Sequence, residues 1–196
     1  VYYLPELEKK VKFLRNNIDS INQIPEIREK AKQDLALLRN ELKEEEERTG
    51  LQFDYLNVLH IGTLSESVLI DVKSYIERLD EHYSKIFNNV NTKLDNIRTY
   101  YSEKKTKTYR RLKDNYHNES VAEQVKKVLE KNKIIEYKDE LIQHVDPIYQ
   151  DPEVEGYFNF RSHFFAPRKH FMGNFYGTYW FNLIIILLMS AILYVT

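Results

Sequence analysis

The chain has no cysteine and, among its 196 residues, only five glycines and five prolines. Without cysteine it cannot form disulfides, use a catalytic thiol or bind a metal through thiolates. Because glycine and proline are the main turn formers, their scarcity favours long helices over a sheet-rich fold. An excess of charge of one sign is also missing, since 29 basic residues balance 30 acidic ones. This balance argues against nucleic acid as a partner, because proteins that bind it usually carry a basic face.

Sequence motifs for catalysis are missing as well. The chain contains no Gly-x-x-x-x-Gly-Lys-Ser/Thr loop for nucleotide phosphates, and neither Gly-x-Ser-x-Gly nor His-Glu-x-x-His. His163 and His170 lie seven residues apart and could share a helical face, but two histidines without a nearby carboxylate are a weak metal signal. We therefore assign no catalytic, cofactor-binding or metal-binding residue, and we expect the chain not to be an enzyme.

Two apolar stripes at helical spacing open the chain. The first comprises Leu4, Leu7, Val11, Leu14, Ile18 and Ile21, and the second comprises Ile27, Ala31, Leu35, Leu38 and Leu42. Ile24-Pro25 separates them, because the residue before a proline is pushed out of the α region, and Gly50 is a suitable C-terminal cap for the second helix. The stripes predict two antiparallel helices that pack on each other.

A much longer stripe predicts one long helix from about residue 66 to residue 101. Thr63 and Glu66 fit a capping box at its start, and no proline or glycine interrupts it. Its apolar residues recur at steps of three and four, namely at Val68, Val72, Ile76, Leu79, Tyr83, Ile86, Val90, Leu94, Ile97 and Tyr101. Two interpretations fit this stripe, the core of a helical bundle or an exposed coiled-coil arm that docks a partner.

The helical region is predicted to end at residue 145. A basic cluster from Lys104 to Arg111 indicates a turn after the long helix. A last helix is predicted up to Val145, just before Asp146-Pro147, from the apolar series Val121, Val125, Val128, Ile135 and Ile142. Residues 1–145 are thus predicted to form a helical bundle domain.

Aromatic residues are concentrated after this domain. Between Tyr149 and Phe181 lie 12 of the 26 aromatic side chains of the chain, together with three of the five glycines. Such a segment cannot be a long regular helix. We interpret residues 146–179, here called the aromatic segment, as a collar next to a membrane.

Residues 180–196 carry no charged side chain and include the run Leu183–Met189. About 20 apolar residues span a bilayer, so the sequence predicts most of a C-terminal transmembrane helix in a chain that is part of a longer protein. Tryptophan and tyrosine prefer the headgroup layer, and the residues predicted to lie there are Tyr176, Tyr179, Trp180 and Phe181. The fold class predicted from the sequence is therefore all-α, with a bundle or coiled-coil hairpin of long antiparallel helices, a juxtamembrane aromatic segment and a C-terminal transmembrane helix.

Several strings of the chain are similar to a known family. They are Asp146-Pro147-Ile148-Tyr149-Gln150-Asp151-Pro152, Phe160-Arg161-Ser162-His163-Phe164-Phe165-Ala166-Pro167, Thr178-Tyr179-Trp180-Phe181-Asn182, Tyr2-Tyr3-Leu4-Pro5-Glu6-Leu7 and Arg39-Asn40-Glu41-Leu42-Lys43-Glu44-Glu45-Glu46. The chain resembles the C-terminal part of ABC transporter proteins of Bacteroidetes in which an ATP-binding cassette is fused to a G-subfamily permease.

The resemblance implies a non-catalytic accessory domain and the last membrane helix of an ATP-driven exporter. ATP and magnesium would bind a cassette outside these residues, and the partners would be the lipid bilayer, other membrane helices of the permease and a second copy in a homodimer. The protein would lie in the bacterial inner membrane with its helical domain in the periplasm. The basic residues Arg161, Arg168 and Lys169 favour the opposite side by the positive-inside tendency, which weakens for long domains.

Coupling between the helical domain and the membrane would fall to the aromatic segment, and the residues expected to carry it are Phe164, Phe165, Arg161 and Arg168. The alternative function is a coiled-coil structural tether with a single C-terminal membrane anchor and no role in transport.

Overall fold

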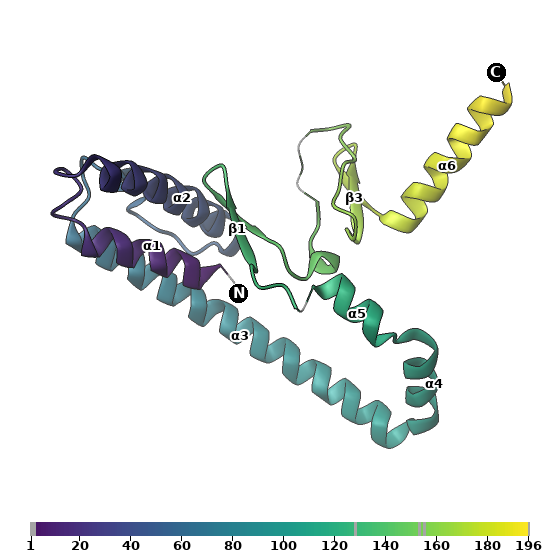
Figure 1. Cartoon of the computed structure of the whole chain (residues 1–196). Helices are drawn as coiled ribbons and strands as arrows, with labels where there is room; N and C mark the ends of the chain where they lie inside the picture. The colour runs from purple at the N-terminus through teal and green to yellow at the C-terminus, as the bar shows by residue number, and fades with distance from the viewer. Residues whose placement is uncertain (1–2, 128, 153, 155, 196) are drawn as a thin grey trace. The chain divides into compact units, whose positions relative to one another are not determined.

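The structure is a computed structural model (Figure 1), and it describes residues 3–127, 129–152, 154 and 156–195. It divides into two compact units. The first comprises residues 1–116 and 133–143, and the second comprises residues 117–132 and 144–196. The chain therefore leaves the first unit after residue 116, returns to it for a short segment and then ends in the second.

Three helices build the core of the first unit. They are α1 (Leu4–Asn16), α2 (Pro25–Thr49) and α3 (Glu66–Lys104), and α1 packs against both of the others (Figure 1). Their apolar stripes meet in a buried cluster, which also takes in Phe53 and Leu59 from the connector between α2 and α3. Removing these side chains from water is the main source of the unit's stability.

Local sequence explains most of the helix boundaries. Ile24 is extended and Pro25 occupies the first turn of α2, where a missing N–H leaves no bond unmade. Gly50 ends α2 in the left-handed conformation, with a φ of 73°, as predicted. The first helix is shorter than its stripe suggests, since it ends at Asn16, although Ile21 beyond it is still buried.

The start of α3 differs from the prediction. Ser65 caps this helix, and its Oγ accepts a hydrogen bond from the Val68 N–H at 3.4 Å. Thr63 instead donates its hydroxyl to the Val58 carbonyl at 2.7 Å. The predicted capping box from Thr63 to Glu66 is therefore wrong, and the N-cap lies two residues later, at Ser65. The sequence could not decide between them, because the hydroxyl of either residue could have capped the helix.

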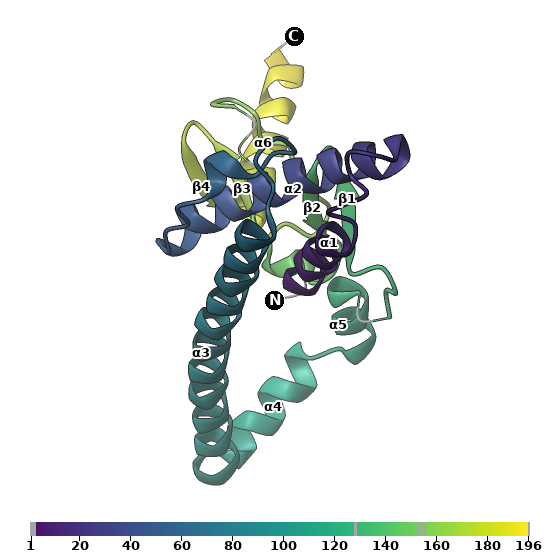
Figure 2. The ribbon, with the colours of Figure 1, turned by 90° about the vertical axis from the view of Figure 1, so that its left-hand side faces the viewer.

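The long helix itself is confirmed. α3 runs for 39 residues without a break, and Figure 2 shows its second half extending past α1 and α2 toward α4 (Thr106–Tyr116). The basic cluster from Lys104 to Arg111 lies at the junction of α3 and α4, which confirms the predicted turn. A short 3-10 helix, η1 (Leu56–Val58), lies in the connector before α3.

The helix predicted up to Val145 is wrong. Helix α5 covers only Glu119–Lys126, and Val128 lies outside the described residues. Ile135 and Ile142 belong to strands β1 (Ile134–Tyr137) and β2 (Glu140–Gln143) and face each other across an antiparallel hairpin. The turn residues Lys138 and Asp139 have positive φ angles of 51° and 59°, as a two-residue hairpin turn requires.

A second hairpin lies in the aromatic segment. Strands β3 (Arg168–Phe171) and β4 (Asn174–Gly177) pair antiparallel, and the turn between them places Met172 and Gly173 at positive φ. Upstream, η2 (Pro147–Tyr149) packs on α5, and the Asp146 N–H donates to the Lys126 carbonyl at 2.9 Å. The two hairpins overturn the prediction of an all-α chain, because paired strands need only short segments that helical periodicity does not detect.

The chain ends in helix α6 (Thr178–Val195), which has 18 residues. Within the described part of the chain, no helix combines the length and the apolarity needed to cross a membrane. The predicted transmembrane helix over residues 180–196 is corrected accordingly.

Candidate functional site

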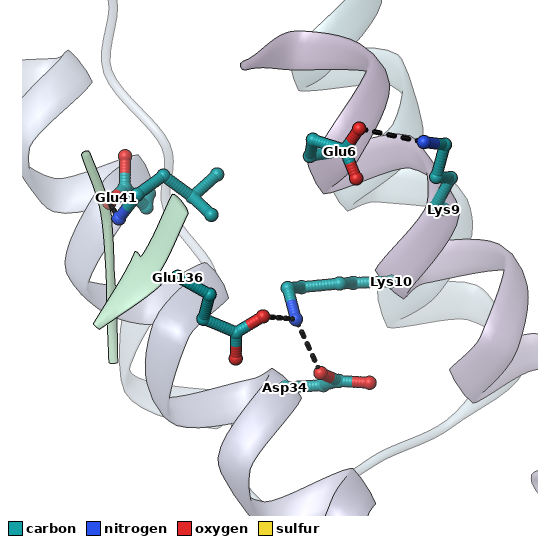
Figure 3. Close-up of polar contacts among 7 residues, drawn as sticks. Glu6, Lys9, Lys10, Asp34, Glu41 and Glu136 are labelled. Carbon is teal, nitrogen blue, oxygen red and sulfur yellow. Dashed lines mark hydrogen bonds and ion pairs between the residues drawn. The ribbon is translucent and has the colours of Figure 1, made fainter. Parts of the chain in front are cut away.

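A partly buried lysine joins α1, α2 and the first hairpin (Figure 3). Lys10 Nζ of α1 donates to Asp34 Oδ1 of α2 and to Glu136 Oε2 of β1, each at 2.7 Å. Burial lowers the pKa of Lys10, but the hydrogen bonds to both carboxylates outweigh it and raise the pKa above its usual value. The three side chains line a cleft of about 300 Å³. Since one ammonium group bridges a carboxylate of α2 and a carboxylate of β1, the three side chains act as a clamp on the hairpin.

A second carboxylate fixes the other strand of the same hairpin. Glu41 of α2 is buried, and its Oε1 accepts the Leu141 N–H at 2.6 Å. Burial raises the pKa of Glu41 to about 7, although this backbone hydrogen bond works against the shift. Next to it, Asn40 Nδ2 donates to the Asp139 carbonyl at 3.3 Å. The hairpin is thus held on α2 by polar contacts at both strands and at its turn.

A third carboxylate lies deeper in the bundle. Glu45 is 1 % exposed, accepts the Tyr83 hydroxyl of α3 at 2.6 Å and pairs through its other oxygen with Arg48. Desolvation is the main cause that raises the pKa of Tyr3 and of Tyr83 beside it. Each oxygen of Glu45 has a partner, and no nucleophile lies in the cluster. The arrangement suits a structural crosslink between α2 and α3.

The two histidines with a weak metal signal have other contacts. His163 Nε2 lies 2.8 Å from the Pro147 carbonyl, and His170 is buried with its ring against Phe175. Among the residues described, no group of three or more His, Cys, Asp or Glu side chains is placed to hold a metal ion.

The predicted membrane-interface residues separate into two groups. Phe181 is only 8 % exposed and packs against the rings of Phe160 and Phe171, with centroids 5.8 Å and 5.7 Å away. Tyr179 and Trp180 are 72 % and 66 % exposed, and their rings contact each other edge to face. Tyr176 of β4 is also exposed, although its ring faces Phe181 at 6.3 Å. Phe181 therefore forms the core that joins α6 to the second hairpin, while Tyr179 and Trp180 are free to meet another surface.

The predicted coupling residues are dispersed. Phe164 is 91 % exposed and contacts the ring of Phe165 at 4.8 Å. Arg161 is exposed, whereas Arg168 forms a two-pronged ion pair with Asp151. That pair lowers the pKa of Asp151 and ties β3 to the segment after η2.

The body of α6 is apolar on all sides. Ile186, Leu187, Leu188 and Met189 are consecutive and each is more than half exposed. Since successive helical residues point about 100° apart, these four surround the helix. An apolar helix surface of this kind is normally covered.

The second half of α3 presents another exposed apolar surface. Ile86, Val90, Leu94 and Ile97 continue the stripe whose first half is buried, and they are 47 %, 55 %, 40 % and 56 % exposed. We call these four residues the α3 stripe. The sequence singled them out as apolar and helical but could not decide between core and exposed arm, because both have the same spacing.

Comparison of the chain with protein-family models, curated proteins and solved structures finds no match.

Proposed function

We propose that the chain is a non-catalytic helical accessory domain of an ATP-driven membrane exporter, attached to the lipid bilayer through α6. The observation that carries the attachment is the apolar surface of α6, which is exposed on all sides over Ile186–Met189. Tyr179 and Trp180 at the start of the helix are exposed as well. The exporter context rests on the family resemblance of the aromatic segment.

The distribution of apolar side chains on α6 favours lipid over a single protein partner. A helix that binds one other helix needs one apolar stripe, whereas Ile186 to Met189 point in all directions. Each such side chain that moves from water into the bilayer contributes about 1.5–3 kcal/mol to the free energy of membrane binding. A tyrosine and a tryptophan at the start of the helix fit the interfacial layer, where the ring is buried and its polar atom stays hydrated.

The inside of the first unit supports a structural role for the domain. Among the described residues three carboxylates are buried, those of Asp34, Glu41 and Glu45, and each binds a partner within the bundle or its hairpin. Buried charges that are paired in this way hold elements together. ATP hydrolysis is assigned to a cassette outside these residues.

Vesicle flotation tests the attachment. The protein is mixed with vesicles of phosphatidylcholine and phosphatidylglycerol and centrifuged through a density gradient. We expect the protein to float, and we expect L187N/L188N to reduce the floating fraction at least about tenfold, because two apolar side chains lose their burial. The matched control is L129N/V154N, which changes two exposed apolar residues outside α6 and should float like the wild type.

The single tryptophan gives an independent readout. Trp180 is exposed at the start of α6, so its fluorescence should shift to shorter wavelength when vesicles are added. Protein that stays at the bottom of the gradient with unchanged Trp180 emission would contradict attachment through α6.

The exporter context and the side of the membrane need separate tests. A Walker A loop encoded in the same open reading frame as this chain, or in a neighbouring gene, would support the exporter context. The absence of such a loop from both would contradict it.

The side of the membrane on which the helical domain lies can be tested by thiol labelling. The exposed Lys104 is changed to cysteine, which is then the only cysteine of the chain. We expect K104C to react with a membrane-impermeant thiol reagent while the inner membrane is intact, and reaction only after its lysis would refute the periplasmic location.

A further inference from the structure

The apolar residues along the whole of α3 recur at intervals of eleven residues. Val68, Leu79, Val90 and Tyr101 form one such series, Val72, Tyr83 and Leu94 form a second, and Ile86 and Ile97 belong to a third. Eleven residues in three turns give 3.67 residues per turn, so that the apolar face stays on one side of a nearly straight helix. The face that packs in the bundle is thus the same face that α3 carries beyond it.

Only the first half of this face is covered. Val72, Ile76 and Leu79 are fully buried by the bundle, whereas the four residues of the α3 stripe are 40–56 % exposed. Neighbouring positions enlarge the exposed surface, since Phe87 is 66 % and Tyr100 is 49 % exposed. A stripe that stays apolar over three further turns without a covering element indicates a docking surface for another helix.

Charge around the α3 stripe indicates what kind of helix this is. Residues 84–113 contain nine lysines and arginines but only two acidic residues, a net charge of +7 in a chain whose total is −1. Lys105 lies over the rings of both Tyr100 and Tyr101, which holds one of these charges next to the end of the stripe. A partner with negative charge beside its apolar residues would be attracted and aligned here.

We propose that the α3 stripe binds an acidic amphipathic helix of another protein, with acidic side chains directed to the basic junction of α3 and α4. A second copy of this chain fits poorly, because it would place one charge of +7 beside another. A membrane surface fits less well than a helix, because the α3 stripe continues an apolar face that already packs on helices in the first half of α3. This proposal is independent of α6 and of the exporter context.

Site-specific crosslinking tests the proposal, since the absence of cysteine makes an introduced thiol unique. Full-length L94C is labelled with benzophenone maleimide, incubated with extract of the cells that produce the protein, and irradiated. The crosslinked peptide is then sequenced by mass spectrometry. The matched control is T99C, on the same helix but on the face opposite the stripe, where the residue is also exposed.

We expect L94C, and not T99C, to crosslink to a segment with excess acidic residues and apolar residues at steps of three and four. Reversing two charges at the junction, as in L94C/R110E/R111E, should lower the yield at least about fivefold, while circular dichroism shows unchanged helix content. Crosslinks to a second copy of the chain, to lipid only, or to a segment without that pattern would overturn the proposal. Equal yields from L94C and T99C, or no crosslink from either, would overturn it too.

Discussion

The two halves of α3 have the same secondary structure and the same apolar spacing but opposite surroundings. In the first half the stripe is buried among α1, α2 and the connector, and Val72, Ile76 and Leu79 have no exposed surface. In the second half the α3 stripe remains about half exposed. The comparison teaches that helical periodicity defines which face of a helix is apolar, while the partner for that face is a separate property.

The halves also differ in what stabilises them. The first half is supported by the bundle core and by hydrogen bonds of Tyr75 and Tyr83 to groups outside α3. Side-chain pairs in the second half are local, such as the Arg98–Asp95 ion pair at 3.6 Å. Such exposed pairs contribute only about 0.2–0.5 kcal/mol. Substitutions in the two halves should therefore change the stability of the protein by very different amounts.

Truncation of one apolar side chain in each half should give very different results. L79A removes a fully buried side chain and leaves a cavity, so we expect the free energy of unfolding to fall by about 2–5 kcal/mol. I97A removes an exposed side chain of the same stripe and should change it by no more than about 0.5 kcal/mol. Urea unfolding followed by circular dichroism measures both. A loss of 2 kcal/mol or more from I97A would mean that the second half is covered within the free protein.

The hydrogen bond between Glu45 of α2 and Tyr83 in the first half of α3 is tested by a substitution of Glu45. E45A leaves the partly buried Tyr83 hydroxyl without its acceptor, so we expect a loss of about 1–3 kcal/mol in the free energy of unfolding. Glu44 is the matched control, because it also pairs with Arg48 but is exposed. E44A should change stability by less than about 0.5 kcal/mol. Similar losses from the two variants would show that Glu45 contributes only a surface ion pair.

Glu41, which binds β2 of the first hairpin, gives the stability of the first unit a pH dependence. Because the pKa of Glu41 is raised to about 7 in the folded protein from 4.5 in the unfolded chain, the folded state binds more protons between these values. The free energy of unfolding should therefore fall as the pH rises from about 4.5 to about 7.

The variant E41Q should flatten this slope, since glutamine does not titrate but still offers an oxygen to the Leu141 N–H. The groups Glu44, Glu45 and Arg48 also act on Glu41 and remain in place. Denaturant unfolding at a series of pH values measures the slope, with E44Q as the control. An equal slope in E41Q and the wild type would assign the pH dependence to another group.

The smallest expected difference in the free energy of unfolding is between variants that remove the hydroxyl of Tyr75 or that of Tyr100. Tyr75 donates to the Leu51 carbonyl at 2.7 Å, and burial raises its pKa to about 12. Y75F should lower the free energy of unfolding by about 0.5–1.5 kcal/mol, whereas Y100F on the exposed half should leave it nearly unchanged. A thermal melt of both variants is sufficient, and a destabilised Y100F would point to an unrecognised contact at the end of α3.

Much of the first unit was predictable because its signals are local. The apolar steps of three and four identify α2 and α3, and Pro25 and Gly50 define the two ends of α2. The polar clamps were not predictable. Lys10 and Glu136 are 126 positions apart, and nothing in the sequence near either residue indicates the other. The one signal in the sequence was the charged side chain of Lys10 on a helix with an apolar face. A prediction from helical periodicity assigns such a side chain to the solvent-exposed face of the helix.

The prediction of an all-α chain was wrong where short segments formed hairpins. Ile135 and Ile142 fit a helical series by spacing alone, yet they are cross-strand partners. The signal that could have revealed this is the Lys138-Asp139 turn between two short apolar stretches, which is weak because neither residue is glycine. The prediction of a transmembrane helix is contradicted as well, since no helix in the described part of the chain is long and apolar enough to cross a membrane.

Local sequence was enough to identify helices α2 and α3, their apolar faces and the aromatic character of residues 149–181, because backbone propensity and periodicity act over a few neighbouring residues. Which apolar residues are covered depends on the tertiary structure, since burial requires elements that meet from distant parts of the chain. It placed Phe181 inside a ring of aromatic side chains and left Trp180 exposed, although the two are adjacent. It likewise buried the first half of α3 and exposed the second, and that difference identifies the surface available to a partner.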